Sequence, residues 1–243
     1  MTIRNSFWQI VRPATDALRK ARQKPKVGSL SWGDFSTTTP INNNWGFERG
    51  TPIDRYYIAA FLEANAGHIQ GRVLEVAGNE YTKQYGGDRV SASDVLHPSE
   101  GNPRATVIAD LAEPSQITDN LFDCVICTQT LQYIFDIHTA TESLYRFLKP
   151  GGVLLLTVPC ISQICREDMA ITGDYWRFTT AALQRLLETQ FPSDAVHIES
   201  HGNVKTSVGF LHGVSADEIP EEELLESDPH CQMLLTGVAT RPK

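Results

Sequence analysis

One stretch of the sequence, residues 71–159, alternates short apolar runs with acids in an order that few architectures accept. It holds an apolar run ending in an acid (GRVLEV), a small-residue turn (AGN) and a second run ending in an acid (VSASD). There follow ADL, an apolar run headed by Phe-Asp, a helical pattern, a Lys-Pro-Gly-Gly turn and the very apolar VLLLTVP. Strands and helices that alternate in this way predict an open, mostly parallel α/β sheet.

The periodicity of the apolar residues gives the bounds of the predicted elements. A helix begins near Thr51 with Pro52 in its first turn, and another follows Thr179 as its N-cap. Two further helices are expected over 79–86 and 137–148. The predicted strands are 72–76, 89–93, 105–109, 122–128, 153–158, 196–200 and 232–239.

Charge and length limit the class of protein. The 243 residues suffice for one α/β domain with an appendage. The net charge is −8, yet residues 1–27 carry seven Lys or Arg and one Asp, so the remainder is strongly acidic. This acidic body argues against nucleic acid as the main partner. No apolar run approaches the roughly 20 residues that span a bilayer, and no signal-peptide core is visible, so we expect a cytoplasmic protein.

The N-terminal part differs in character from the rest. Residues 3–22 have helical apolar spacing with a basic opposite face, and residues 25–50 form a polar arm with four aromatic anchors. The helix could bind a membrane surface or an anionic partner, or dock on its own domain or on a second subunit of a homodimer. Its short apolar face favours docking. We therefore divide the chain into residues 1–50, a helix and arm that act as a lid, and a domain over residues 51–243.

Five cysteines occur, two of them as Cys124-x-x-Cys127. Because residues three apart in a strand point to opposite faces, these two cannot share a metal. Buried free thiols are therefore predicted, and no other His, Asp or Glu set has metal-ligand spacing.

Acids and small residues after the predicted strands indicate a nucleoside site. The turn at Ala77 and Gly78 lets backbone approach a ligand. Asp94, about twenty residues further on, can accept both hydroxyls of a ribose, and Asp110 or the Leu111 N–H can meet an adenine. A dinucleotide site would require Gly-x-Gly-x-x-Gly, whereas this turn reads AGNEYT.

The successive segments VLEVAGNEY, SASDVL, IADL, FDCVICTQTLQYI and LYRFLKPGGVLLLTVP resemble the motifs of class I S-adenosylmethionine-dependent methyltransferases of type 11. GDYWRFT and RGTPIDRYYI extend the likeness to bacterial members found with glycan and natural-product pathways. The resemblance implies a Rossmann-like, doubly wound sheet of seven strands, mostly parallel, whose last two strands form an antiparallel edge. It implies S-adenosylmethionine as cofactor, bound by Glu75, Ala77, Gly78, Asn79, Asp94, Val95, Asp110, Leu111, Thr128, Gln129 and Leu131.

The expected reaction moves a methyl group to an oxygen or nitrogen of a small molecule, a saccharide or a natural-product scaffold. Asp174 is the first candidate for general base, because a loop carboxylate beside aromatic side chains can have a raised pKa; a salt bridge with Arg177 is the alternative. Further catalytic candidates are Gln132, Tyr133 and His212. Candidates for acceptor contacts are Arg49, Asp54, Arg55, Tyr56, Tyr175, Trp176 and Arg177.

Two other functions stay open. A nicotinamide-dependent oxidoreductase could use a similar sheet, although the glycine-poor turn argues against it. A non-catalytic scaffold could retain the fold, since Ala77, Asn79 and Tyr81 stand where the family commonly has glycines.

Overall fold

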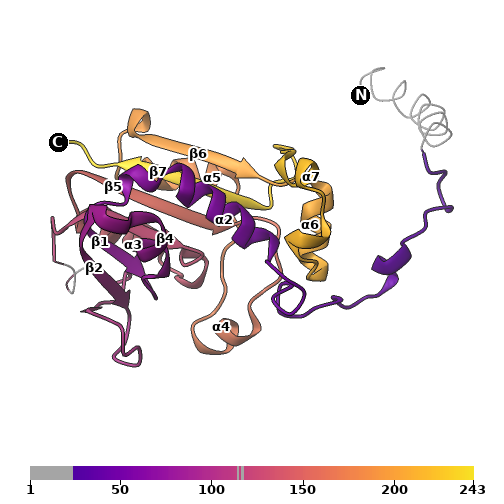
Figure 1. Ribbon diagram of the computed structural model, residues 1–243, viewed down its shortest axis with the longest axis horizontal. Coiled ribbons are helices and arrows are strands. Elements are labelled where there is room, and N and C mark those ends of the chain that lie inside the picture. Colours follow the sequence, from indigo (N-terminus) through magenta and orange to yellow (C-terminus); the bar gives the residue numbers. More distant parts are fainter. Residues whose placement is uncertain (1–23, 114, 116–117) are drawn as a thin grey trace, which may run out of the picture. The chain divides into compact units, whose positions relative to one another are not determined.

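The computed structural model describes residues 24–113, 115 and 118–243 (Figure 1). The chain divides into two units, Met1–Ile41 and Asn42–Lys243. In the first, a single turn of 3-10 helix covers Gly33–Ser36. The helix predicted over 3–22 lies outside the described residues, so the lid stays a prediction. The second unit starts before the predicted boundary at residue 50, because the Asn42 N–H bonds the His212 carbonyl (3.0 Å).

A seven-stranded sheet organises the second unit, in the order β3-β2-β1-β4-β5-β7-β6. Parallel pairing joins the first five, and β7 is antiparallel to both β5 and β6. This confirms the predicted fold class and its antiparallel edge. The strands are β1 Gly71–Val76, β2 Val90–His97, β3 Val107–Ile108, β4 Phe122–Thr128, β5 Leu148–Pro159, β6 Val196–His201 and β7 Leu234–Thr240.

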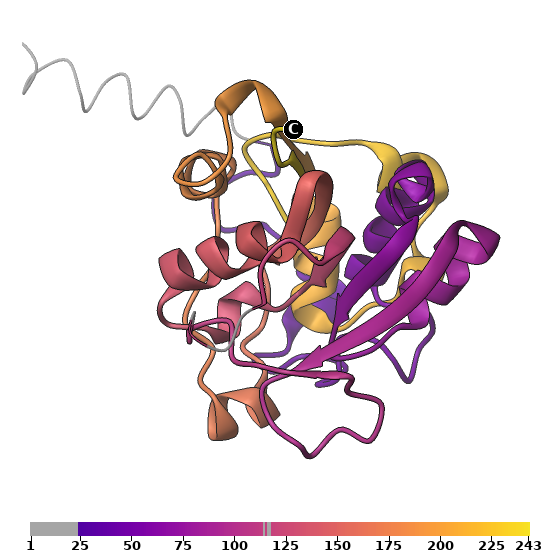
Figure 2. The same cartoon turned by 90° about the vertical axis from the view of Figure 1, so that its left-hand side faces the viewer.

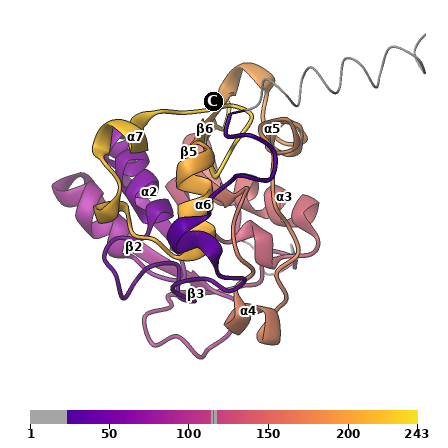
Figure 3. The same ribbon diagram turned by 90° about the vertical axis from the view of Figure 1, so that its right-hand side faces the viewer.

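Helices cover both faces of the sheet (Figures 2 and 3). One face packs against α2 and α6, and the other against α3 and α5. The helices are α2 Ile53–Ala64, α3 Ile137–Phe147, α4 Arg166–Ile171, α5 Thr180–Leu187, α6 Val204–His212 and α7 Glu221–Leu225. Asp136 caps α3 by accepting from Thr139 N, and Thr179 caps α5 as predicted.

Strand β4 is buried on both faces of the sheet. Val125 and Cys127 belong to one buried cluster, and Cys124 and Ile126 to the other. A parallel sheet covered on both sides has to bury successive residues in this way. Cys124 and Cys127 therefore lie on opposite faces, as predicted. Cys160 and Cys165 are buried as well, whereas Cys231 is partly exposed.

Three differences from the predicted elements matter for the site. Strand β2 continues to His97 instead of ending at residue 93. The short helix expected over 79–86 spans residues 80–86, and its part over Thr82–Gly86 is a π-helix. Helix α4, which the sequence did not predict, follows β5 on the loop beside the carboxyl ends of the parallel strands (Figure 1).

Candidate active site

The order of the strands places a crevice between β1 and β4. From β1 the chain proceeds outward to β2 and β3, then returns to β4 and proceeds the other way. Ligands bind at such a reversal, outside the carboxyl ends of the strands. Ala77 follows β1 and Gln129 follows β4, so these two residues border the crevice from its two sides.

Ala77 and Gln129 share an unusual backbone conformation. Their φ angles are 67° and 49°, in the left-handed region that side chains with a Cβ disfavour. Hydrogen bonds to the neighbouring strands hold them there: Ala77 N–H donates to Leu96 O (2.8 Å), and Gln129 N–H donates to Thr157 O (2.9 Å). Strain of this kind, about 1–3 kcal/mol per residue, is commonly found at functional sites.

A cavity of about 880 Å³ occupies the crevice. Small-molecule sites measure roughly 300–1,000 Å³, so a nucleoside-sized ligand fits. Its walls include seven of the predicted cofactor residues: Glu75, Ala77, Gly78, Asp110, Leu111, Thr128 and Gln129.

Glu75 shapes the turn after β1. Its carboxylate accepts from Thr82 N and Thr82 Oγ1, both at 2.7 Å, and from Tyr81 N at 3.3 Å. Burial raises the pKa of Glu75, and the bonds from Thr82 partly oppose that rise. The carboxylate thus holds the chain around the ligand cavity, with the small Ala77 and Gly78 facing the open space.

Asp94, the residue predicted to hold the ribose, does not line the cavity. Asp94 lies inside β2, opposite Leu74 of β1. Its Oδ2 accepts from Arg72 Nε (2.7 Å) and its Oδ1 from Thr106 Oγ1 (2.8 Å). The strand ends three residues later, so His97 and Pro98 line the cavity in its place. The apolar pair Val95 and Leu96 was the sequence signal for a longer strand.

Three further residues that were predicted to bind the cofactor do not line the cavity. Val95 is buried and bonds Thr106 Oγ1 through its N–H (3.0 Å). Leu131 is buried in the apolar core. Asn79 donates from Nδ2 to Ser93 Oγ (3.2 Å). The cavity wall also contains Tyr81 and the ion-paired Glu80 and Arg104, which the sequence did not predict as site residues.

A second cavity, of about 170 Å³, adjoins the first. Arg55, Gln129, Tyr133 and Asp168 line both, so the two cavities share this part of their walls. The predicted residues Asp54, Arg55, Gln132, Tyr133 and Arg177 meet in this second cavity, which we call the small cavity. Trp45 and Phe47, anchors of the polar arm, form an aromatic part of its wall.

Asp54 is the buried carboxyl of the small cavity. It lies in the first turn of α2, is 9% exposed, and its Oδ2 accepts from Arg55 Nη1 (3.0 Å). Burial raises the pKa of Asp54, and the charge of Arg55 opposes that rise. A carboxyl with a raised pKa inside a cavity has the property that was expected of Asp174.

Three amide atoms of the small cavity are buried and lack a hydrogen-bond partner in the structure: Gln129 Nε2, Gln132 Oε1 and Gln163 Oε1. The first can only donate, and the other two can only accept. Gln132 is fixed because its Nε2 donates to Gln129 O (2.9 Å). Tyr133 stands beside them, and burial strongly raises the pKa of its phenol.

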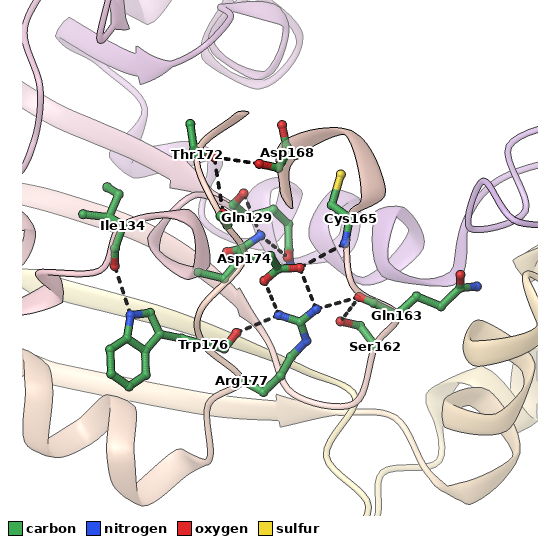
Figure 4. A network of polar contacts seen from close by, with 12 residues as sticks. Gln129, Ile134, Ser162, Gln163, Cys165, Asp168, Thr172, Asp174, Trp176 and Arg177 are labelled. Atoms are coloured by element: carbon green, nitrogen blue, oxygen red, sulfur yellow. Dashed lines mark hydrogen bonds and ion pairs between the residues drawn. The ribbon is translucent and has the colours of Figure 1, made fainter. Parts of the chain in front are cut away.

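Asp174 forms the salt bridge that was the alternative to its role as base (Figure 4). Arg177 donates from Nη1 to Oδ1 (2.5 Å) and from Nη2 to Oδ2 (2.9 Å), and Cys165 N donates to Oδ2 (3.0 Å). Burial would raise the pKa of Asp174, but the bonds from Arg177 and Cys165 outweigh it and lower the pKa. The Asp174 side chain lines neither cavity. The prediction that its pKa is raised is wrong.

The remaining candidates are separated from the cavities, except Tyr175 on the wall of the larger one. His212 ends α6. Arg49 pairs with Glu218, Tyr56 packs edge-on against Tyr57, and Trp176 donates from Nε1 to Ile134 O (3.0 Å). Across the described part of the chain, no group of three or more His, Cys, Asp or Glu could hold a metal ion. In the same residues, no helix is long and apolar enough to cross a membrane.

The family profile described as a methyltransferase domain matches residues 64–156. Two curated relatives bear the name ubiquinone/menaquinone biosynthesis C-methyltransferase. The one from Hydrogenovibrio crunogenus is 31% identical over 108 residues, which are 44% of this chain and 39% of that protein. The one from Haemophilus ducreyi is 47% identical over 45 residues, 18% of this chain and 17% of that protein. The matched part of the chain thus spans less than half the length of either relative.

Solved structures agree with the fold. A Mesorhizobium loti S-adenosylmethionine-dependent methyltransferase has a TM-score of 0.53 at 18% identity, covering 78% of this chain and all (100%) of that one. A Haloferax volcanii complex of the Trm112 activator with a putative methyltransferase gives 0.54 at 16% identity, covering 82% and 95%. At these identities the likeness establishes the architecture.

Proposed function

Because the chain carries a class I S-adenosylmethionine-dependent methyltransferase domain, we propose that it transfers the methyl group of S-adenosylmethionine to an oxygen or nitrogen atom of a small molecule. One observation carries this proposal: the cavity in the crevice between β1 and β4 shares Gln129, Arg55, Tyr133 and Asp168 with the wall of a separate small cavity. A donor and an acceptor need two such adjoining spaces.

The larger cavity fits the cofactor. Its volume is sufficient, and the turn at Ala77 and Gly78 leaves room for the amino-acid end. Asp110 and Leu111 would hold the adenine, and His97, which ends β2, would face the ribose. The cofactor supplies a methyl group on a positively charged sulfur, which is already reactive.

The protein then contributes chiefly alignment. Holding two reactants in line can lower a barrier by as much as about 7–11 kcal/mol. Gln129 lines both cavities, and its backbone is fixed by Thr157, so it is well placed to align donor and acceptor. Trp45, Phe47 and Phe210 contribute aromatic surface to the wall of the small cavity, against which the acceptor would pack.

The acceptor class is a saccharide or a natural-product scaffold. Polar side chains such as Gln132, Asp54 and Arg177 contribute much of the small cavity's wall, and this polarity supports an acceptor that bears hydroxyl or amino groups. The two curated relatives are named as C-methyltransferases, whereas the polar wall favours a heteroatom acceptor here.

Titration calorimetry with S-adenosylhomocysteine and with NAD tests the cofactor. We expect S-adenosylhomocysteine alone to bind. Binding of NAD alone would assign an oxidoreductase, and no binding of either would assign a scaffold.

A substitution in the cavity wall tests the place of the cofactor. Gly78→Val, which places a side chain in that wall, should weaken the binding of S-adenosylhomocysteine at least tenfold. Gly101→Val is the matched control, because a Cβ at Gly101 meets only Ser99 Oγ, at 3.7 Å.

A further inference from the structure

The small cavity contains buried amide groups whose missing hydrogen bonds indicate which kind of ligand it binds. Gln129 Nε2 and Gln132 Oε1 are both buried and unpartnered, and both residues line this space. A buried polar atom without a partner is costly, so such atoms indicate a ligand that supplies the missing hydrogen bonds. One atom donates and the other accepts. A hydroxyl group, which does both, is the simplest group that satisfies the pair.

The position of this amide pair indicates where in the small cavity the hydroxyl group would lie. Gln129 belongs to the walls of both cavities, whereas Gln132 belongs to the small one alone. A hydroxyl held between them therefore lies on the side of the small cavity that adjoins the larger one. The 3-10 turn Leu131–Tyr133 fixes Gln132, whose Nε2 bonds Gln129 O.

The size and walls of the small cavity limit the rest of the ligand. Its 170 Å³ is close to the roughly 150 Å³ that holds one benzene ring. Trp45 and Phe47 contribute aromatic surface to the wall against which such a ring would pack. Asp54 supplies the carboxylate of this cavity that lies on the rigid helix α2.

We propose, on the basis of the function proposed above, that the small cavity binds one hydroxylated six-membered ring of the sugar or cyclitol type, and that Asp54 is the general base for methylation of its hydroxyl. Gln129 and Gln132 position that hydroxyl. The Asp54 carboxylate takes the hydroxyl proton while the oxygen forms its bond to the methyl carbon. The electron pair of the sulfur–carbon bond stays on sulfur, which becomes neutral. The products are a methyl ether, S-adenosylhomocysteine and a protonated Asp54, which returns its proton to water.

Ring binding is measured first, by calorimetry in the presence of S-adenosylhomocysteine. The probes are myo-inositol and the methyl glycosides of glucose, galactose, mannose and rhamnose. We expect at least one to bind, and Gln132→Leu to weaken it at least tenfold while S-adenosylhomocysteine affinity stays unchanged. If S-adenosylhomocysteine binds but no ring does up to the solubility limit, or if Gln132→Leu has no effect, this inference is overturned and the proposed function stands. If S-adenosylhomocysteine itself fails to bind, the proposed function fails instead.

Base catalysis is measured in single turnovers with the ring that binds. Asp54→Asn should slow methyl transfer by about 10²–10⁴-fold, and Asp54→Glu should recover part of the rate. Ring affinity should stay within about threefold of the parent value in both variants. Glu63→Gln, on the exposed side of the same helix, controls for effects on folding.

The pH profile separates Asp54 from its neighbours. The charged and titratable groups facing it are Arg55 on its own helix, Tyr81 after β1, and Tyr133, Cys165, Asp168 and Arg177 across the small cavity. The rate should rise with pH as Asp54 ionises, and Asp54→Asn should remove this ascending limb. An unchanged rate in Asp54→Asn, or an ascending limb lost in Asp168→Asn and kept in Asp54→Asn, would overturn the assignment.

Discussion

Arg72 on β1 and Asp94 on β2 form an ion pair across the sheet, with Nε and Oδ2 2.7 Å apart. The same carboxylate accepts from Thr106 Oγ1, just before β3, so one side chain joins three neighbouring segments. Arg72 also lies over the Phe122 ring, 5.2 Å from its centroid. Asp94 therefore stabilises the sheet edge beside the cofactor cavity and does not line the cavity.

This arrangement changes what a substitution of Asp94 should do. We expect Asp94→Asn to lower the free energy of unfolding by about 1–2 kcal/mol, because a charge-assisted bond is lost. The affinity for S-adenosylhomocysteine should stay within about threefold. His97→Ala is the counterpart and should weaken that ligand about tenfold with little change in stability. Urea unfolding and calorimetry measure the two effects. A large affinity loss in Asp94→Asn would return Asp94 to the ribose site.

The sheet was predictable because apolar runs bounded by turn residues identify buried strands. The predicted strand 122–128 has the bounds of β4, and the prediction for β1 differs by one residue. The end of β2 was less predictable. Asp94 looks like a terminal acid, yet its pairing with Arg72 and Thr106 lets the strand continue. No local pattern reveals partners on other strands.

Helix α6 escaped prediction for a related reason. It contains Gly209, a poor helix former, in its interior. Gly209 faces α2: a Cβ there would lie in van der Waals contact with Ile53 Cδ1, at 3.4 Å. The same packing places Phe210 beside the small cavity. Tertiary contact thus overrides local preference, and the small cavity formed from α2, the β4 turn and α6 was not visible in the sequence.

Asp174 and Arg177 should behave as a structural pair. Asp174→Ala leaves the half-buried Arg177 charge without its partner, and we expect the free energy of unfolding to fall by about 3 kcal/mol. A double-mutant cycle with Arg177→Ala should give a coupling of about 1–3 kcal/mol. Asp194→Ala, at an exposed position, is the control and should change little. A fully stable Asp174→Ala variant whose ascending pH limb disappears would instead identify Asp174 as the base.

The strained turn at Ala77 predicts a substitution that stabilises the protein, in contrast to those above. The left-handed conformation costs a residue with a Cβ about 1–2 kcal/mol, whereas glycine loses about 0.4–1 kcal/mol through its more flexible unfolded chain. Ala77→Gly should therefore raise the free energy of unfolding by about 0.5–1 kcal/mol. Ala92→Gly, at an exposed position of β2 with ordinary φ, should lower it by a similar amount. Destabilisation by Ala77→Gly, measured by urea unfolding, would contradict the inferred strain.

Arg49 and Glu218 make the stability of the second unit sensitive to acid. The hydrogen bonds from Arg49 and from Ser215 N–H lower the pKa of Glu218 to about 2 from its usual 4.5. Because the folded pKa is the lower one, the folded state binds this proton less readily than the unfolded state. The stabilisation is present above pH 4.5 and is lost as pH falls from there toward 2.

Glu218→Gln should lower the urea midpoint at neutral pH, and the difference from the parent protein should vanish near pH 2. Glu222→Gln, on the exposed side of α7, is the control. A difference between Glu218→Gln and the parent that persists unchanged at pH 2 would mean that the carboxylate charge is not the source of the effect.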